Sequence, residues 1–281
     1  GWDGAGLYGR GVTLTLRQVN VYSNVVDVYD VDDSAAYGGG VAMNGGTLLA
    51  EDCAFRWNSA WARSVTFGGG LSISGTVAAT VTRSLFQDND AWHSGGLYFR
   101  GDTHSALSVD RCSFIDNGRG HSRGRAYGGY AAALEVRNAR ARIENTMIKD
   151  NSVANDLGAL HVADSDLCLA RNVITGNWAG RTSGMDLLNV SPLTVTNNIV
   201  ADNVSRRSWL ELPAVRLRGG TGHFVHNTIA GNDSAYGLEI ASGAKVSLTN
   251  TILVSHTVGI SVTNDSAASL EGTLWGSGPW A

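Results

Sequence analysis

The sequence predicts a parallel β-helix, an all-β solenoid of ten coils, and two recurring columns of residues predict it. The first column is an asparagine that recurs about every 25 to 34 residues, with an apolar residue three positions before it. The second is a pair of apolar positions that lie eight and ten residues before each asparagine. Repeats of this length are typical of solenoids, in which each repeat is one structural unit.

The asparagine column is predicted to form a structural ladder along the coil. Its members are Asn24, Asn58, Asn89, Asn117, Asn151, Asn177, Asn203 and Asn232. His256 and Ser277 continue the series, which gives ten repeats. Asn tolerates a left-handed turn conformation, and stacked amide side chains can hydrogen-bond from coil to coil. We therefore assign these residues a structural role and not a catalytic one.

Each repeat is predicted to hold about three short strands separated by turns. Two apolar positions separated by one residue, such as Leu107 and Val109, mark a strand with one buried face. The residue six positions before the asparagine is always polar and is expected to face solvent. A glycine cluster, as in residues 38–40, precedes the first strand, because glycine permits tight turns and close approach of neighbouring coils.

Composition places the chain in one elongated domain, residues 1–281, with no linker or charge block dividing it. We expect it to be part of a longer chain or a subunit that stacks end to end. The net charge of −4 argues against a nucleic-acid partner. No segment has the ~20 consecutive apolar residues that a membrane helix needs. Cys53 and Cys112 fall in one column two coils apart, too distant for a disulfide, so we expect buried free thiols.

The repeats resemble those of two protein groups. The paired signals of a glycine cluster and F-x-x-N, as in Phe55–Asn58, Phe86–Asn89 and Phe114–Asn117, are similar to the repeats of polymorphic outer-membrane protein adhesins. Over its full length the chain resembles right-handed parallel β-helix proteins of the pectate-lyase-like superfamily. That resemblance implies a secreted or cell-surface protein, either an enzyme that cleaves polysaccharides or a non-enzymatic adhesin, because the fold does not fix the function.

The segments that follow each asparagine vary in length and are rich in aromatic and basic residues. We call the following set the Trp/Arg edge: Trp57, Trp61, Arg63, Trp92, His93, Arg123, Arg125, Trp178, Arg181, Arg206, Arg207 and Trp209. Exposed aromatic rings and forked guanidinium groups suit an acidic or neutral polysaccharide, and they suit a protein contact equally well. The third alternative is that these loops fold onto the coil and bury their own aromatic side chains.

An acidic column is the main candidate for chemistry. Asp88, Asp116 and Asp150 immediately precede the asparagine in three successive repeats. Carboxylates spaced by ~4.8 Å repel one another unless water or a cation such as Ca²⁺ lies between them. Arg119 or His121, in the following loop, could then serve as the base of a polysaccharide lyase. The alternative is that aspartate is simply favoured at a solvated turn.

Two functions remain open on the sequence alone. The first is a non-enzymatic extracellular or cell-surface β-helix (an adhesin, stalk or filament component) with no required cofactor. It would use the Trp/Arg edge to bind a glycan, or would associate with copies of itself end to end or laterally. The second is a polysaccharide lyase or hydrolase, dependent on Ca²⁺, that acts on an acidic polysaccharide at the Asp88, Asp116 and Asp150 column.

Overall fold

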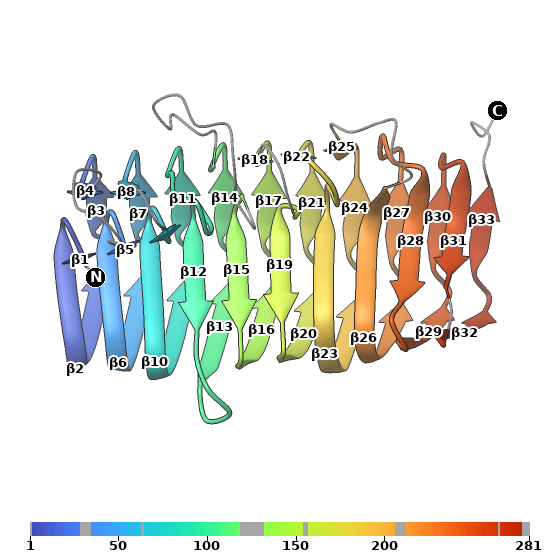
Figure 1. Cartoon of the computed structure of the whole chain (residues 1–281), viewed down its shortest axis with the longest axis horizontal. Coiled ribbons are helices and arrows are strands. Elements are labelled where there is room, and N and C mark those ends of the chain that lie inside the picture. Colours follow the sequence, from blue (N-terminus) through green and yellow to red (C-terminus); the bar gives the residue numbers. More distant parts are fainter. Residues whose placement is uncertain are drawn as a thin grey trace.

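A computed structural model describes residues 2–28, 35–62, 65–118, 132–153, 157–205, 212–263 and 265–276. These residues form strands, bridges and turns, and no helix occurs among them. The strands stack side by side along one long axis, from the N-terminal end to the C-terminal end of the chain (Figure 1). All strand pairings between neighbouring coils are parallel, and partners lie about one repeat apart in the sequence, as in the pairing of Phe86 with Phe55 and Phe114. The predicted parallel β-helix is therefore confirmed.

A ten-stranded sheet contains one strand from each coil, which confirms the predicted ten repeats. Its strands, in order, are β3 (Asn20–Tyr22), β7 (Ala54–Arg56), β11 (Leu85–Gln87), β14 (Ser113–Ile115), β17 (Met147–Lys149), β21 (Val173–Thr175), β24 (Ile199–Ala201), β27 (Thr228–Ala230), β30 (Ile252–Val254) and β33 (Leu274–Gly276).

A fifteen-stranded sheet forms the other two walls of the coil. In five coils one long strand spans both walls: β2 (Leu7–Arg17), β6 (Val41–Glu51), β10 (Leu71–Thr82), β23 (Met185–Thr196) and β26 (Pro213–Val225). In the other five the walls are separate strands: β12 (Leu97–Arg100) and β13 (Ala106–Asp110), β15 (Leu134–Arg137) and β16 (Arg140–Glu144), β19 (Leu160–Ala163) and β20 (Asp166–Ala170), β28 (Tyr236–Ala241) and β29 (Lys245–Thr249), and β31 (Val258–Val262) and β32 (Ala267–Glu271).

Short strands after the ladder asparagines form three smaller sheets. They are β1 (Trp2–Asp3) with β5 (Ala35–Tyr37) and β9 (Val65–Phe67), β4 (Val25–Val28) with β8 (Ser59–Ala62), and β18 (Ser152–Val153) with β22 (Trp178–Ala179) and β25 (Val204–Ser205). Since no helix is present in the described ranges, none of those residues forms a helix that could cross a membrane.

The core runs along the inside of the coil, and like side chains stack on like. Phe55, Phe86 and Phe114 are fully buried, with ring centroids 4.7 Å and 4.6 Å apart and nearly parallel planes. Glycine keeps the coils close, because a Cβ on Gly70 would lie 2.8 Å from the carbonyl oxygen of Gly96 in the next coil. Cys53 and Cys112 are buried free thiols, as predicted.

The ladder is confirmed, and the asparagines from Asn58 to Asn203 bond in the same way. The Nδ2 of Asn89 donates to Oδ1 of Asn117 (3.0 Å) and to the carbonyl of Phe55 (2.8 Å), while its backbone N–H donates to the same Oδ1 of Asn117 (3.1 Å). In the ninth coil the ladder position is His256, and its Nε2 lies 3.3 Å from Nδ2 of Asn232, where the earlier coils have an asparagine amide. Ser277 lies outside the described residues.

The left-handed residue at this corner is the one before the asparagine, which corrects our expectation for the asparagine itself. Trp57, Asp88, Asp116 and Asp150 have φ between 52° and 57°, whereas no ladder asparagine has a positive φ. The ladder residue therefore has ordinary backbone geometry, and its amide is used entirely for hydrogen bonds between coils.

A second, shorter ladder occupies the corner before the ten-stranded sheet. The Nδ2 of Asn172 donates to Oδ1 of Asn198, and that of Asn198 donates to Oδ1 of Asn227, at 2.9 Å and 3.0 Å. The residue before each of these three is again left-handed, with φ of 56° or 57°. The polar column that we expected to face solvent is this left-handed column.

Candidate functional site

The structure places six residues of the Trp/Arg edge: Trp57, Trp61, Trp92, His93, Trp178 and Arg181. The other six lie outside the described residues: Arg63, Arg123, Arg125, Arg206, Arg207 and Trp209. Each of the six that are described lies within four residues of a ladder asparagine. Trp57 lies at the corner itself, whereas His93 reaches Glu135 of β15 in the fifteen-stranded sheet. That these residues form a binding edge stays a prediction.

Among the described residues of the edge, Trp57 is the most accessible aromatic residue. Its side chain is 46% exposed and packs edge-on against the ring of Tyr22, which is 60% exposed, at a centroid distance of 5.0 Å. The left-handed φ of Trp57 turns the chain away from the sheet at that point. Tyr22 lies on β3, one coil before Trp57, and the sequence analysis did not include it in the edge. The pair forms an aromatic surface that spans two coils.

The other described tryptophans of the edge, Trp61, Trp92 and Trp178, are half-buried. Trp61 lies on β8 and Trp178 on β22, where Trp178 pairs with Ser152 and Val204 of neighbouring coils. The backbone N–H of Trp92 donates to Oγ1 of Thr66 at 2.6 Å. These three rings are thus partly packed onto the coil, while Arg181 is exposed.

The Asp column occupies left-handed turns. Asp88, Asp116 and Asp150 each end a strand of the ten-stranded sheet with a positive φ, a conformation that Asp adopts more readily than most side chains. Among the residues the structure describes, no three His, Cys, Asp or Glu side chains are grouped so that they could hold a metal ion. Arg119 and His121, the bases proposed beside this column, lie outside the described residues. The Ca²⁺ site and the catalytic assignment remain predictions.

A row of buried ionisable side chains lies on the outer face of the fifteen-stranded sheet, and the sequence analysis did not identify it. Glu135 on β15, His161 on β19 and Asp186 on β23 are direct register partners in three adjacent strands. Their neighbours along each strand, such as Leu134 and Val136, belong to the core, so the three side chains point out of the coil. They are nevertheless 0%, 1% and 0% exposed. We call them the buried charged row.

Glu135 has two nitrogen-bearing partners, a histidine and an arginine. Nδ1 of His93 lies 3.1 Å from Oε2, and Nε of Arg137 donates to Oε1 at 2.6 Å. Burial alone raises the pKa of this carboxyl, but the hydrogen bond from His93 and the nearby positive charges outweigh burial and lower it. His93 also stacks on Phe67 at 4.7 Å and is only 11% exposed. It is therefore largely enclosed beside the buried charged row, although it belongs to the Trp/Arg edge by sequence.

Asp186 is held in a similar way at the other end of the row. Nδ1 of His161 lies 3.0 Å from Oδ2, and Nη2 of Arg218 donates to the same oxygen at 2.9 Å. Burial opposes ionisation here too, but the hydrogen bond with His161 and the charge of Arg218 lower the pKa of Asp186. Oδ1 of Asp186 and Nε of Arg218 are buried without a partner among the described residues.

A signal for this row is present in the sequence. In each coil an aliphatic residue follows the glycine cluster, and the next residue belongs to one column along the coil. Five consecutive coils carry an acidic, basic or histidine side chain in this column: Glu135, His161, Asp186, Arg216 and Glu239. The first coils carry Ala42, Ser72 and Tyr98 at this position. Strand alternation assigns this column to solvent, so the sequence pattern does not predict its burial.

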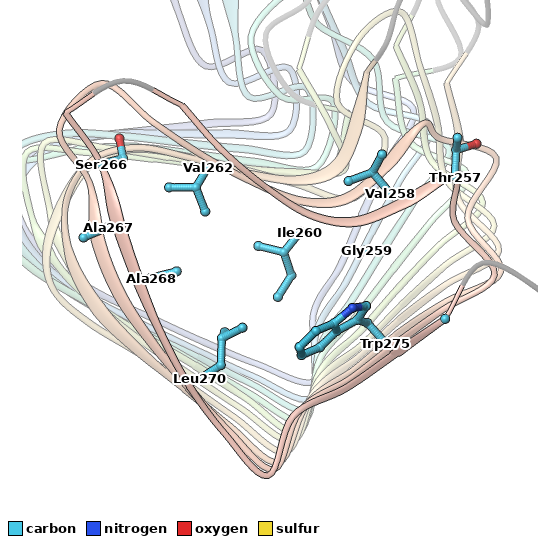
Figure 2. Close-up of a pocket in the computed structure, with 11 residues that line it drawn as sticks. Thr257, Val258, Gly259, Ile260, Val262, Ser266, Ala267, Ala268, Leu270 and Trp275 are labelled. Atoms are coloured by element: carbon cyan, nitrogen blue, oxygen red, sulfur yellow. The ribbon is translucent and has the colours of Figure 1, made fainter.

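Two cavities lie away from the buried charged row. A pocket of about 730 Å³ is formed by the last coil, where Ile260, Leu270 and Trp275 point toward the centre of the coil cross-section (Figure 2). It is the exposed end of the apolar core and holds no charged side chain. A shallower groove of about 580 Å³ crosses β10, β13, β16 and β20, beside Arg140, Arg142 and Asp166.

Comparison with known proteins agrees with this architecture. The model of the family described as "right handed beta helix region" matches residues 122–274, more than half of the chain. The chain belongs to this family. The right-handed form of the predicted β-helix is thereby established.

Other comparisons add little about function. The chain is similar to the crystal structure of the periplasmic alginate epimerase AlgG, with 11% sequence identity and a TM-score of 0.46 over 94% of this chain and 78% of that one. A similarity of this level carries no information about ligand or reaction. No protein of curated function matches the chain significantly in sequence.

Proposed function

We propose that this right-handed β-helix is a non-enzymatic extracellular or cell-surface protein that binds a polysaccharide along the Trp/Arg edge. The exposed Trp57–Tyr22 pair is the observation that carries the proposal. Flat aromatic faces that are already ordered lose little entropy when a sugar ring packs against them. Trp61, Trp92 and Trp178 extend the aromatic surface along the same corner.

The polymer is proposed to lie along the coil axis and to carry acidic groups. Neighbouring coils are spaced by ~4.8 Å, so a residue repeated at one corner every coil or two offers contacts at intervals comparable to a sugar unit. Arg181 is exposed at this corner and supplies a forked donor for a carboxylate or sulfate. A chain with several such weak contacts gains affinity through multivalency.

The proposal is tested by affinity electrophoresis against a panel of neutral, uronate-containing and sulfated polysaccharides. The native chain is expected to be retarded by at least one acidic polymer, and the Trp57→Ala/Tyr22→Ala variant is expected to lose most of that retardation. Tyr8→Ala is the matched control, because Tyr8 is 44% exposed on a different wall of the coil. The proposal is contradicted if no polysaccharide retards the native chain. It is also contradicted if the Trp57→Ala/Tyr22→Ala variant and the Tyr8→Ala control lose retardation equally.

A second candidate, a lyase acting on an acidic polysaccharide, is favoured by the His161–Asp186 pair. A histidine whose Nδ1 is held by a buried carboxylate is oriented to accept a proton at Nε2. In a lyase reaction it would take the proton from the carbon alpha to the uronate carboxyl while the bond to the leaving oxygen breaks and a double bond forms. Since His161 is 1% exposed, its Nε2 is shielded from solvent. The binding role is therefore placed first.

An assay on polygalacturonate and alginate, with and without added Ca²⁺, separates the two candidates. Formation of unsaturated product that is lost in His161→Gln but kept in Asp116→Asn would support the lyase at the buried charged row. Loss in Asp116→Asn, with a Ca²⁺ requirement, would support the Asp column instead. No product on any acidic polymer, with or without Ca²⁺, would leave the binding function as the proposal.

A further inference from the structure

The outer face of the ten-stranded sheet carries a column of exposed aliphatic side chains. Met147, Val173, Ile199, Ile252 and Leu274 are 40%, 37%, 44%, 39% and 43% exposed. They are register partners through β17, β21, β24, β30 and β33, with Thr228 of β27 completing the column. A contiguous row of this kind differs from single exposed apolar residues and marks an interaction surface. We call it the aliphatic ridge.

Smaller side chains lie beside the aliphatic ridge on the same face. The residues two positions later in each strand also point outward, and most of them are small: Thr175, Ala201, Ala230, Val254 and Gly276. We call this second column the small-residue lane. The aliphatic ridge and the small-residue lane run parallel to each other along the coil axis.

The two margins of this face carry opposite charges. Arg171 is exposed at the corner before β21. Asp150 and Asp202 lie at the opposite corner, one coil before and one coil after that of Arg171. No charged residue other than Lys149 lies on the face itself between β17 and β33.

From these observations we propose that a second copy of this chain docks on the face, related by a two-fold axis parallel to the coil axis. That axis places the aliphatic ridge of each copy over the small-residue lane of the other. It also brings Arg171 of one copy to the margin that holds Asp150 and Asp202 of the other. A two-fold axis along the strands would instead oppose ridge to ridge and like charge to like charge.

The face is large enough for such a dimer. Eight strands, β11 to β33, spaced by ~4.8 Å and about 16 Å wide from corner to corner, offer on the order of 600 Å² per copy. The total of about 1,200 Å² is at the lower end of specific protein interfaces. This estimate leaves out the first two coils, where Tyr22 and Trp57 are reserved for the polysaccharide.

Sedimentation equilibrium of the native chain tests the proposal. A reversible dimer is expected, with Ile199→Asp weakening dimerisation by at least a hundredfold because it buries a carboxylate in an apolar contact. Val12→Asp is the control, since Val12 is 43% exposed on another wall. Ile252→Ser is a milder second variant, and circular dichroism verifies that each variant is folded. A monomer at ~100 µM, or a dimer that Ile199→Asp leaves intact, overturns the proposal.

Spin labels test the orientation of the two copies. Labels placed singly at Arg111→Cys or Asn250→Cys, in a Cys168→Ser background, lie at exposed positions five coils apart. In the proposed dimer the two copies of one labelled position lie at the same height along the coil axis. Pulsed electron paramagnetic resonance should therefore give a shorter distance when both copies carry the label at the same position than when one copy is labelled at 111 and the other at 250. A shorter distance between a label at 111 in one copy and a label at 250 in the other would contradict a two-fold axis parallel to the coil axis.

Discussion

At the residue scale, the ladder asparagines carry an unusual number of hydrogen bonds for single side chains. Asn117 accepts bonds at Oδ1 from the backbone N–H and Nδ2 of Asn89, and donates from Nδ2 to Asn151 and to the carbonyl of Phe86. All of these groups are buried. Removal of one amide therefore leaves several polar atoms without partners, and each unsatisfied atom costs about 1–3 kcal/mol.

We predict that Asn117→Ala lowers the free energy of unfolding by about 3–5 kcal/mol, because at least two buried donors and one acceptor lose their partners. Urea denaturation followed by circular dichroism measures the change. Asn20→Ala is the control, since Asn20 is exposed on β3, and it should change stability by no more than about 0.5 kcal/mol. Equal effects of the two substitutions would show that the ladder bonds contribute nothing specific.

At the element scale, the sequence was sufficient where a rule repeats in every coil. Phe55, Phe86 and Phe114 recur at one position relative to Asn58, Asn89 and Asn117, so strand, turn and ladder could be predicted from the period alone. For the residues before Asn172, Asn198 and Asn227, the sequence predicts a polar side chain but not the positive φ. That φ is set by hydrogen bonds between coils, which a single repeat does not display.

The buried charged row was beyond this reasoning for a physical reason. Alternation correctly places Glu135, His161 and Asp186 on the outer face of their strands. Whether an outer face is exposed to solvent depends on segments from other coils, such as the one that places His93 beside Glu135. The positions of these segments cannot be predicted from strand periodicity. The same limit applies to the Trp/Arg edge, where the sequence predicted the corner but not the exposure of each ring.

The buried charged row gives these strands a pH dependence. Glu135 and Asp186 have folded-state pKa values below their ordinary values of 4.5 and 3.8, so their ionised forms stabilise the fold. That stabilisation is fully present above the ordinary pKa values and is lost as the pH falls through the lowered ones. Arg137 and Arg218 remain charged throughout, so acidification leaves two half-buried cations without their anions.

We predict that the melting temperature of the native chain falls steeply between about pH 5 and pH 2. Glu135→Gln should be less stable at pH 7, because Arg137 loses its counter-charge and His93 loses a carboxylate partner, yet it should lose less stability on acidification. Differential scanning fluorimetry across this range measures both effects. A Glu135→Gln variant with the native acid dependence would contradict the assignment of that dependence to Glu135.

At the scale of the whole molecule, the coil provides surfaces in place of a single cleft. The described cavities are the apolar end of the coil and a shallow groove on one wall. Tyr22 and Trp57 lie on the first two coils, whereas the aliphatic ridge spans β17 to β33, so polysaccharide binding at this pair and pairing of two copies use different coils. A dimer with parallel coils would present two aromatic corners running in the same direction, which would raise the avidity for a long polymer.

The central claim, that the aromatic corner binds an acidic polysaccharide, is tested most directly by isothermal titration with an oligosaccharide of the polymer that retards the native chain. We predict that Trp57→Ala raises Kd about tenfold, equivalent to about 1.4 kcal/mol, at unchanged thermal stability. An unchanged Kd in the Trp57→Ala variant would contradict the claim.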